Sequence, residues 1–75
     1  MLDMKSLDYY EFLQISPNAE IDTIHRVYRY LAARYHPDNP ASADPEKFAL
    51  LRMAYEVLSD PARRAEYDAT YQTEG

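Results

Sequence analysis

Two stretches of the chain place apolar side chains at the spacing of an amphipathic helix. In the first stretch they recur at intervals of three or four residues, at Ile21, Ile24, Tyr28, Leu31 and Tyr35. In the second they recur in the same way at Phe48, Leu51, Tyr55 and Leu58, with Ala54 on the same face. Such intervals line up on one side of an α-helix and predict one buried stripe per helix. Two helices of similar length joined by a short loop pack most simply antiparallel, so the two stripes would supply the core.

Capping residues indicate where the first two helices begin. Asp8 followed three residues later by Glu11 has the pattern of a capping box and predicts a first helix over residues 9–13. Pro17 then breaks the helical pattern, because the residue before a proline is disfavoured in helical geometry. Asn18 is the expected N-cap of the second helix.

The third and fourth helices have a common start signal. Asp44-Pro45 supplies an N-cap and a proline at the first helical position, and Ser59-Asp60-Pro61 repeats this arrangement. The fourth helix is predicted to be short, over residues 62–68, and the polar chain beyond Ala69 is expected to fray. The predicted fold is all-α: an antiparallel hairpin of the second and third helices, with short first and fourth helices.

The chain is long enough for one small domain. Of its 75 residues, 47% are hydrophobic, which is typical of a folded domain rather than of a disordered tail. We expect a flexible N-terminus at residues 1–6, the domain at 7–69, and a polar tail or the start of a linker at 70–75. As an isolated domain it is expected to be a monomer.

The residue types that are missing narrow the classes of protein. The sequence has no cysteine, which excludes disulfides and cysteine-based zinc sites and fits a reducing compartment, so we expect a cytoplasmic protein. We see no signal peptide, and no apolar run approaches the roughly 20 residues of a membrane span. We therefore expect no membrane association within this segment.

Charge is distributed unevenly. The net charge is −5, a poor indication for nucleic-acid binding, which usually requires a basic surface. On the second helix, however, Arg26 lies opposite the apolar stripe, Arg29 lies beside Arg26 on this outer face, and Arg34 lies further out. An acidic protein thus carries one basic helical face, although most helical arginines are simply solvated.

Between the two long helices stands His36-Pro37-Asp38. A helix end explains the proline and the aspartate but not the histidine. A catalytic acid–base pair would need a nucleophile or an orienting partner, and the sequence offers no cysteine and no glycine-rich phosphate loop. His25 and His36 are separated by roughly 16 Å along a helix and cannot share a metal ion. We expect no catalytic residue, no metal and no cofactor.

The arrangement resembles the J-domain, the module that DnaJ-type co-chaperones present to DnaK-type (heat shock protein 70) ATPases. "LDYYEFLQIS" is similar to the first helix of the family, "IHRVYRYLAARYHPD" to its second helix and tripeptide, and "FALLRMAYEVLSDPARRAEYD" to its third and fourth helices. The resemblance covers the chain from about Leu7 to Asp68. The tripeptide alone is a weak signal, but the tripeptide followed at this distance by "AYEVLSDP" is very specific.

The resemblance implies a function without catalysis of its own. In the family, the tripeptide and the basic face of the second helix dock on the ATPase and speed its ATP hydrolysis, which assists protein folding. Asp38 would accept charge-assisted hydrogen bonds, Pro37 would fix the loop and His36 would order its tip. Phe48 is open between a core role and a partner contact. The residues implied in partner binding are His36, Pro37, Asp38, Arg26, Tyr28, Arg29, Arg34, Asn39 and Phe48.

Some positions depart from the common pattern of the family. Tyr30 and Asn39 stand where basic residues are frequent, which predicts weaker or more salt-sensitive docking, or a partner with a specialised surface. Gln14 stands where a glycine is usual, so the turn after the first helix is expected to carry a small backbone cost. Leu50 and Met53 stand where charged residues are frequent. They are either ordinary exposed apolar residues or a second interface with another domain or subunit.

Two other functions compete with the co-chaperone. One is a J-like interaction or scaffold module that binds a partner without stimulating ATP hydrolysis; the intact tripeptide argues against it. The other is nucleic-acid binding through the arginine face; the acidic balance argues against that. The client and the particular ATPase partner are not encoded in this segment.

Overall fold

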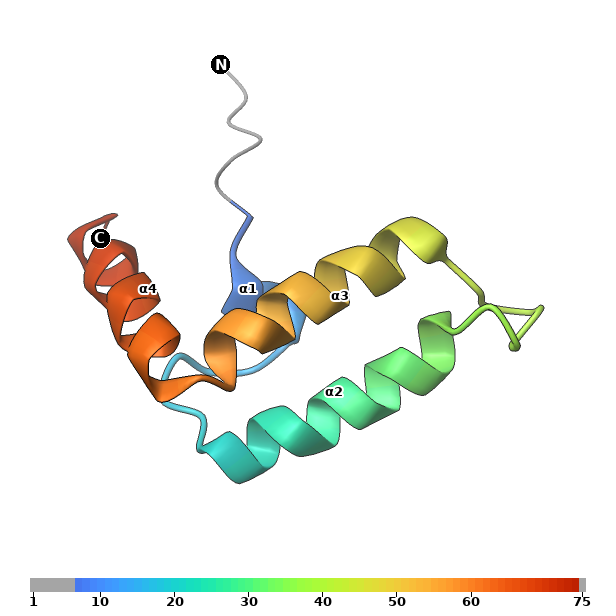
Figure 1. The fold of residues 1–75 in the computed structure, drawn as a ribbon, viewed down its shortest axis with the longest axis horizontal. Coiled ribbons are helices and arrows are strands. Elements are labelled where there is room, and N and C mark those ends of the chain that lie inside the picture. Colours follow the sequence, from blue (N-terminus) through green and yellow to red (C-terminus); the bar gives the residue numbers. More distant parts are fainter. Residues whose placement is uncertain (1–6, 75) are drawn as a thin grey trace, which may run out of the picture.

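The computed structural model describes residues 7–74, which form four helices: α1 (Tyr9–Phe12), α2 (Ile21–Tyr35), α3 (Pro45–Leu58) and α4 (Pro61–Glu74). The long helices α2 and α3 run side by side in opposite directions, with their connecting loop at one end (Figure 1). α1 packs against α3 on one face of this hairpin, and α4 packs against α3 at the end away from the loop. The predicted all-α hairpin is confirmed. The flexible segment predicted at residues 1–6 lies outside the described residues.

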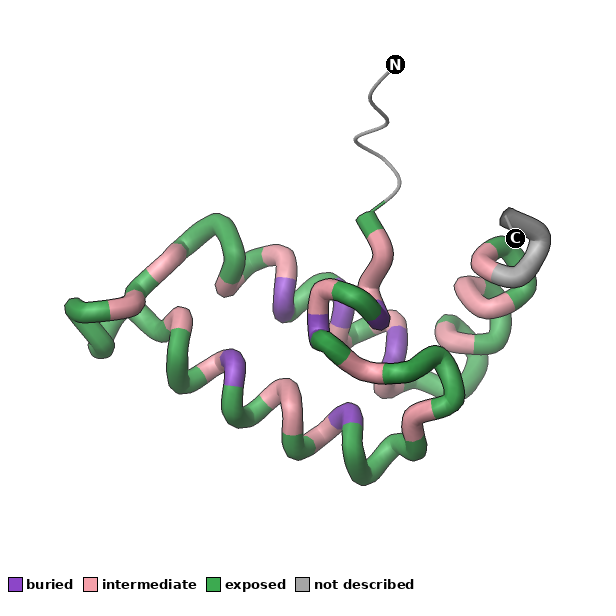
Figure 2. Tube along the Cα trace, turned by 180° about the vertical axis from the view of Figure 1, so that it is seen from behind, coloured by how far each residue is buried: buried purple, intermediate pink, exposed green. Residues whose placement is uncertain are grey.

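One apolar core joins three of the helices. Its buried members are Tyr10, Leu13, Ile24, Leu31, Leu51, Ala54 and Leu58. Both predicted stripes contribute to this core. Tyr10 of α1 and Leu13, directly after α1, complete it. Figure 2 shows that the buried positions lie away from the loop that connects α2 and α3, and residues 32–50 contain none. The side chains in the half of the hairpin next to the connecting loop are therefore at most half-buried.

Three of the predicted helix starts have the expected side-chain cap. Asp8 Oδ1 accepts a hydrogen bond from the backbone N–H of Glu11 at 3.1 Å. Asp44 and Asp60 accept in the same way from Lys47, at 3.1 Å, and from Ala62, at 3.0 Å. Each bond satisfies a backbone donor that the first helical turn leaves without a partner.

The prediction for the start of α2 was wrong. The N-cap is Glu20 rather than Asn18, and it makes no side-chain cap hydrogen bond. Asn18 belongs instead to a turn, in which its N–H donates to Ser16 Oγ at 2.9 Å. Ile21, predicted in the buried stripe, is 44% exposed. It is the first residue of the helix, so the buried stripe of α2 begins only at Ile24.

The prediction that α4 ends at Asp68 and frays beyond Ala69 was also wrong, because the helix continues to Glu74. Tyr67 and Tyr71 explain the extension, since residues four apart share one face of a helix. The Tyr67 ring stacks on Tyr9 with centroids 4.8 Å apart, and the Tyr71 ring meets Tyr10 edge-on at 5.3 Å. The Tyr71 hydroxyl also donates to Asp8 Oδ2 at 3.1 Å. Whether residues 70–75 also begin a linker stays a prediction.

A single arginine ties α4 to the chain before α2. Arg64 Nη2 donates to the backbone oxygens of Pro17, at 3.1 Å, and Ala19, at 2.7 Å. Its Nε donates to the Tyr10 hydroxyl at 3.0 Å, and Nε lies 3.8 Å from Asp68 Oδ2. We call these contacts the Arg64 network. The network fixes the entrance to α2, which has no cap of its own.

Burial raises the pKa of Tyr10 to about 12, and the hydrogen bond that its hydroxyl donates to Asp68 adds to the rise. An unfolded tyrosine titrates near pH 10. The folded protein therefore resists ionisation that the unfolded chain allows, so stability is full below about pH 10 and is lost as the pH rises toward 12. The free energy of unfolding in urea should fall between pH 9 and pH 11. A Tyr10→Phe variant should show a smaller fall; equal falls in the two proteins would contradict this.

The turn after α1 has the backbone cost that the sequence predicted. Gln14 has a φ of 61°, in the left-handed region, and is the only non-glycine residue among 7–74 with a positive φ. A side chain in this region costs about 1 kcal/mol relative to glycine. Replacing Gln14 by glycine would remove this cost, but part of the gain in stability is offset by the greater conformational freedom of glycine in the unfolded chain.

Gln14→Gly should therefore raise the free energy of unfolding by about 0.5–1 kcal/mol in urea titrations. The Gln14 side chain is exposed, so no packing is lost. Gln14→Ala keeps the Cβ atom and is the matched control, for which we expect no such gain. A glycine variant no more stable than the alanine variant would refute the prediction.

Candidate functional site

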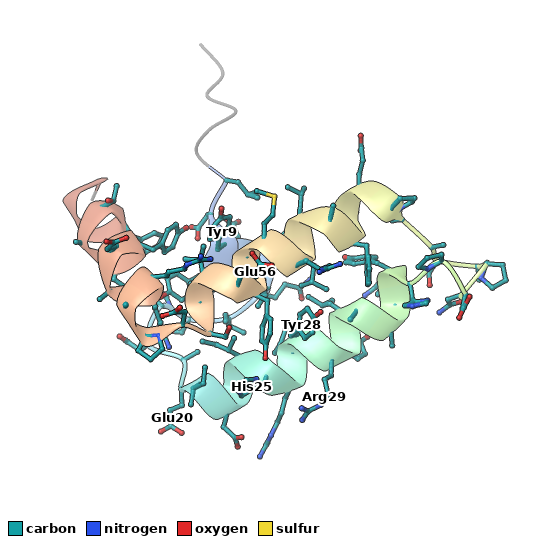
Figure 3. All side chains as sticks on the ribbon, in the orientation of Figure 1. Tyr9, Glu20, His25, Tyr28, Arg29 and Glu56 are labelled. Atoms are coloured by element: carbon teal, nitrogen blue, oxygen red, sulfur yellow. The ribbon has the colours of Figure 1, made fainter. Side chains whose placement is uncertain are left out.

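The outer face of α2 carries three arginines in different states. Arg26 Nη2 lies 3.1 Å from Asp22 Oδ2, one helical turn earlier, and both side chains are more than two-thirds exposed. Arg29 and Arg34 are exposed and have no acidic partner among the side chains of residues 7–71. Figure 3 shows Arg29 pointing away from α3. The predicted basic face is present, but Asp22 already neutralises one of its members.

Tyr28 lies on the side of α2 that faces α3. Its ring stacks on Tyr55 with centroids 3.9 Å apart, and Tyr55 in turn hydrogen-bonds to His25 Nδ1 through its hydroxyl at 2.5 Å. Figure 3 shows Tyr28 directed from α2 toward α3. Because the residue is only half-buried, it both joins the two helices and leaves an aromatic edge beside the arginines.

The loop between α2 and α3, residues 36–44, is tied to the end of α2. Ser42 Oγ donates to the carbonyl oxygen of Arg34 at 2.5 Å, and the N–H of Asp44 donates to that of Tyr35 at 3.1 Å. Asn39 Nδ2 lies 3.5 Å from the carbonyl oxygen of Ala33. These are the carbonyls that a helix C-terminus leaves without an intrahelical partner. We call residues 36–44 the tip loop; its own side chains and backbone cap the helix and so fix the loop.

Within the tip loop, His36 and Asp38 contact each other. The N–H of Asp38 donates to His36 Nδ1 at 3.0 Å, and the same nitrogen lies 3.7 Å from Asp38 Oδ2. The Asp38 side chain is 94% exposed, whereas the His36 side chain is 47% exposed. The His36 ring meets Phe48 of α3 edge-on, with centroids 5.5 Å apart. The tip loop therefore holds the histidine ring against α3 and directs a carboxylate into solvent.

A shallow groove lies beside the tip loop on α3. Its lining is mostly apolar, and the lining residues are Pro37, Pro45, Phe48, Ala49, Arg52, Met53 and Glu56. Met53 is 52% exposed, as the sequence predicted, and Phe48 links this groove to His36. Leu50 is half-buried and does not line the groove, so whether Leu50 and Met53 form a second interface stays a prediction.

This arrangement is suited to binding a charged surface. The exposed Asp38 carboxylate lies in the loop that directly follows α2, the helix that bears the exposed arginines. Across residues 7–74, no three His, Cys, Asp or Glu side chains are grouped so that they could hold a metal ion. No helix in that range is long and apolar enough to cross a membrane.

Comparison with known proteins supplies the family. The model of the DnaJ domain matches residues 8–68, which is most of the chain. The chain belongs to the DnaJ domain family. The resemblance seen in the sequence, together with the helical hairpin expected from it, is thereby confirmed.

Relatives of this DnaJ domain share about half of its residues. It is 51% identical over 67 residues to a "Chaperone protein DnaJ" of Wolbachia pipientis wMel, and 52% identical over 66 residues to one of Geobacillus kaustophilus (strain HTA426). Each match covers 87% of this chain but only 18% and 17% of the relative. The chain thus spans under a fifth of the length of these relatives.

Sequence reasoning missed two parts of this DnaJ domain's site. The ion pair of Asp22 with Arg26 was not predicted, although a spacing of four residues on a helix is the signal for such a pair. The ties of Ser42 and Asn39 to the end of α2 were not predicted. Small polar residues after a helix favour such local bonds but do not say which carbonyl they reach.

Proposed function

We propose that this DnaJ domain is a co-chaperone module that binds a DnaK-type chaperone and stimulates its ATP hydrolysis. The observation that carries the proposal is the presentation of Asp38: an almost fully exposed carboxylate on a loop whose other groups are occupied in holding it. A preorganised loop loses little conformational entropy on binding. The family assignment supports a DnaK-type partner in general.

Two surfaces would divide the work. The arginines of α2 would attract and orient an acidic surface of the ATPase, which raises the association rate and makes binding sensitive to salt. Asp38 would then accept short charge-assisted hydrogen bonds from a basic side chain of the ATPase. Tyr28 and Phe48 would border these contacts with aromatic surface.

The ATP chemistry would belong to the partner. The DnaJ domain would act by binding the hydrolysis-competent state of the ATPase better than its other states, and so shift the population toward that state. In this proposal it needs no cofactor, works in the cytoplasm and assists protein folding as one part of a longer co-chaperone.

The test is single-turnover ATP hydrolysis by a bacterial DnaK-type chaperone, with the wild-type domain and with the His36→Gln variant. Acceleration by the wild type that is lost in the variant would support the proposal. Binding without acceleration would instead support a scaffold module. Absence of both at low salt would refute the DnaK-type partner.

The three arginines should contribute unequally to this docking. Arg26 must give up its ion pair with Asp22 before it can bind a partner, whereas Arg29 has no such competitor among the side chains of residues 7–71. An exposed pair one turn apart is worth about 0.3–0.5 kcal/mol, which reduces the gain available from Arg26 by about two-fold.

Arg29→Ala should therefore raise the domain concentration needed for half-maximal stimulation more than Arg26→Ala does. The difference between the two variants should shrink as salt is raised. Removing the competitor with Asp22→Asn should make the domain more sensitive to Arg26→Ala. Titrations of the three single variants and of the Asp22→Asn, Arg26→Ala double variant against the chaperone at two salt concentrations measure this. Equal losses in both arginine variants, unchanged by Asp22→Asn, would contradict it.

A further inference from the structure

The contact inside the tripeptide has a recognisable local geometry. His36 Nδ1 accepts a hydrogen bond from the backbone N–H two residues later, that of Asp38, at 3.0 Å. This is the pattern in which an Asn or Asp side chain forms an Asx turn, with the side-chain oxygen in place of the ring nitrogen. The His36 ring thus accepts the backbone hydrogen bond that closes the turn, as the side chain of Asn or Asp does in an Asx turn.

The geometry also fixes the state of the ring. A ring nitrogen accepts a hydrogen bond only while it carries no proton, so in this arrangement the proton of a neutral His36 is on Nε2. The edge-on contact with Phe48, at 5.5 Å, holds the ring from the side of α3. His36 itself is extended, with φ −61° and ψ 142°, as expected for a residue before proline.

The bond has a consequence for the carboxylate. Because the N–H of Asp38 is occupied within the turn, the backbone of Asp38 is fixed while its side chain stays 94% exposed. If that bond were lost, the loop would sample other arrangements, and only a fraction of the molecules would present the carboxylate correctly.

We propose that His36 is a positioning residue, which acts through the N–H of Asp38 by way of Nδ1 rather than by a contact of Nε2 with the partner. This inference rests on the proposed function, since it explains how the tip loop is prepared for docking. It assigns separate tasks within the tripeptide: His36 forms the turn, Pro37 restricts the backbone and Asp38 contacts the ATPase.

Two substitutions separate this role from direct contact. In His36→Asn, the amide oxygen takes the place of Nδ1 and can rebuild the turn, but nothing stands at Nε2. In His36→Gln, the amide reaches the place of Nε2, but the acceptor for the N–H of Asp38 is gone. Both substitutions are at a half-exposed side chain outside the buried core, so both variants should fold.

The first measurement is single-turnover stimulation of the DnaK-type chaperone by the wild type and the two variants. We expect the order wild type, then Asn, then Gln, with the Asn variant stimulating about three- to ten-fold more than the Gln variant, the range of one net hydrogen bond. A Gln variant that equals or exceeds the Asn variant would overturn the positioning role.

The second measurement needs no partner. The ¹⁵N spectrum of the free domain should show the His36 ring protonated at Nε2 only. The amide proton of Asp38 should show the small temperature dependence of a bonded N–H in the wild type and in His36→Asn, but not in His36→Gln. An unbonded Asp38 amide in the wild type would overturn the inference. If that amide is bonded but the wild type does not stimulate the chaperone, the proposed function fails, and the positioning role fails with it.

Discussion

Replacing Asp38 with asparagine should remove most of the stimulation of the chaperone while leaving the fold unchanged. The substitution keeps the shape of the side chain and deletes its charge. Truncating one partner of a desolvated, hydrogen-bonded charge pair costs about 2–5 kcal/mol, or at least about 30-fold in affinity. Single-turnover ATP hydrolysis at limiting domain concentration measures the loss. Urea unfolding should give the same stability for both proteins, because the Asp38 side chain is 94% exposed.

Asp22→Asn is the matched control for this experiment. It makes the same chemical change beside Arg26 on α2, at a side chain that is 71% exposed. Under the proposed function Asp22 would compete with the partner for Arg26, so this variant should stimulate at least as well as the wild type. A comparable loss in the two variants would show that acidic charge in general, and not the carboxylate at the tip loop, is what matters.

Arg64→Met should cause the largest loss of stability among substitutions outside the apolar core. Methionine preserves the aliphatic length but removes every hydrogen bond of the Arg64 network. The side chain is only 19% exposed, and hydrogen bonds to charged groups contribute about 1.5–3 kcal/mol each, so we expect a loss of about 3 kcal/mol. For a domain of 75 residues with marginal stability, this leaves a substantial unfolded fraction, visible by circular dichroism.

The adjacent arginine gives a direct comparison. Arg63 is 59% exposed, and its guanidinium lies 4.0 Å from Glu56, so Arg63→Met should cost less than about 1 kcal/mol. Arg64→Lys keeps the charge but lacks the planar fork of donors, and should fall between the two methionine variants. Similar losses for Arg63→Met and Arg64→Met would refute the role given to the network.

The sequence was sufficient wherever a feature depends on neighbours along the chain. The stripes through Ile24 and Leu31, and through Leu51 and Leu58, follow from helical periodicity alone. The side-chain caps at Asp8, Asp44 and Asp60 follow from local hydrogen bonding. The backbone cost at Gln14 was expected only from the resemblance to the family, in which a glycine is usual at that position. For the site, the positions of the tripeptide and of the arginines could be predicted in the same way.

The rest depends on contacts between distant parts of the chain. Nothing near Arg64 indicates that it reaches the carbonyl oxygens of Pro17 and Ala19, and this contact accompanies the shift of the start of α2 past Asn18. The extra length of α4 depends on Tyr71 meeting Tyr10 across the fold. The residues around Tyr71 are polar, so the sequence suggested a polar tail. A single tyrosine in such a segment does not indicate which distant residue it packs against.

Residues 32–50 contain no buried side chain, so the end of the hairpin next to the tip loop should open locally more easily than the end that contains the core. The amide proton of Asp38 in the tip loop is held by an exposed hydrogen bond, whereas the amide protons around the buried Leu51 and Leu58 are expected to exchange only when the core opens. Substitutions in the tip loop should therefore have little effect on global unfolding. Under the proposed function, the presentation of Asp38 can vary during evolution while folding stays the same, because the tip loop and the buried core occupy different ends of one hairpin.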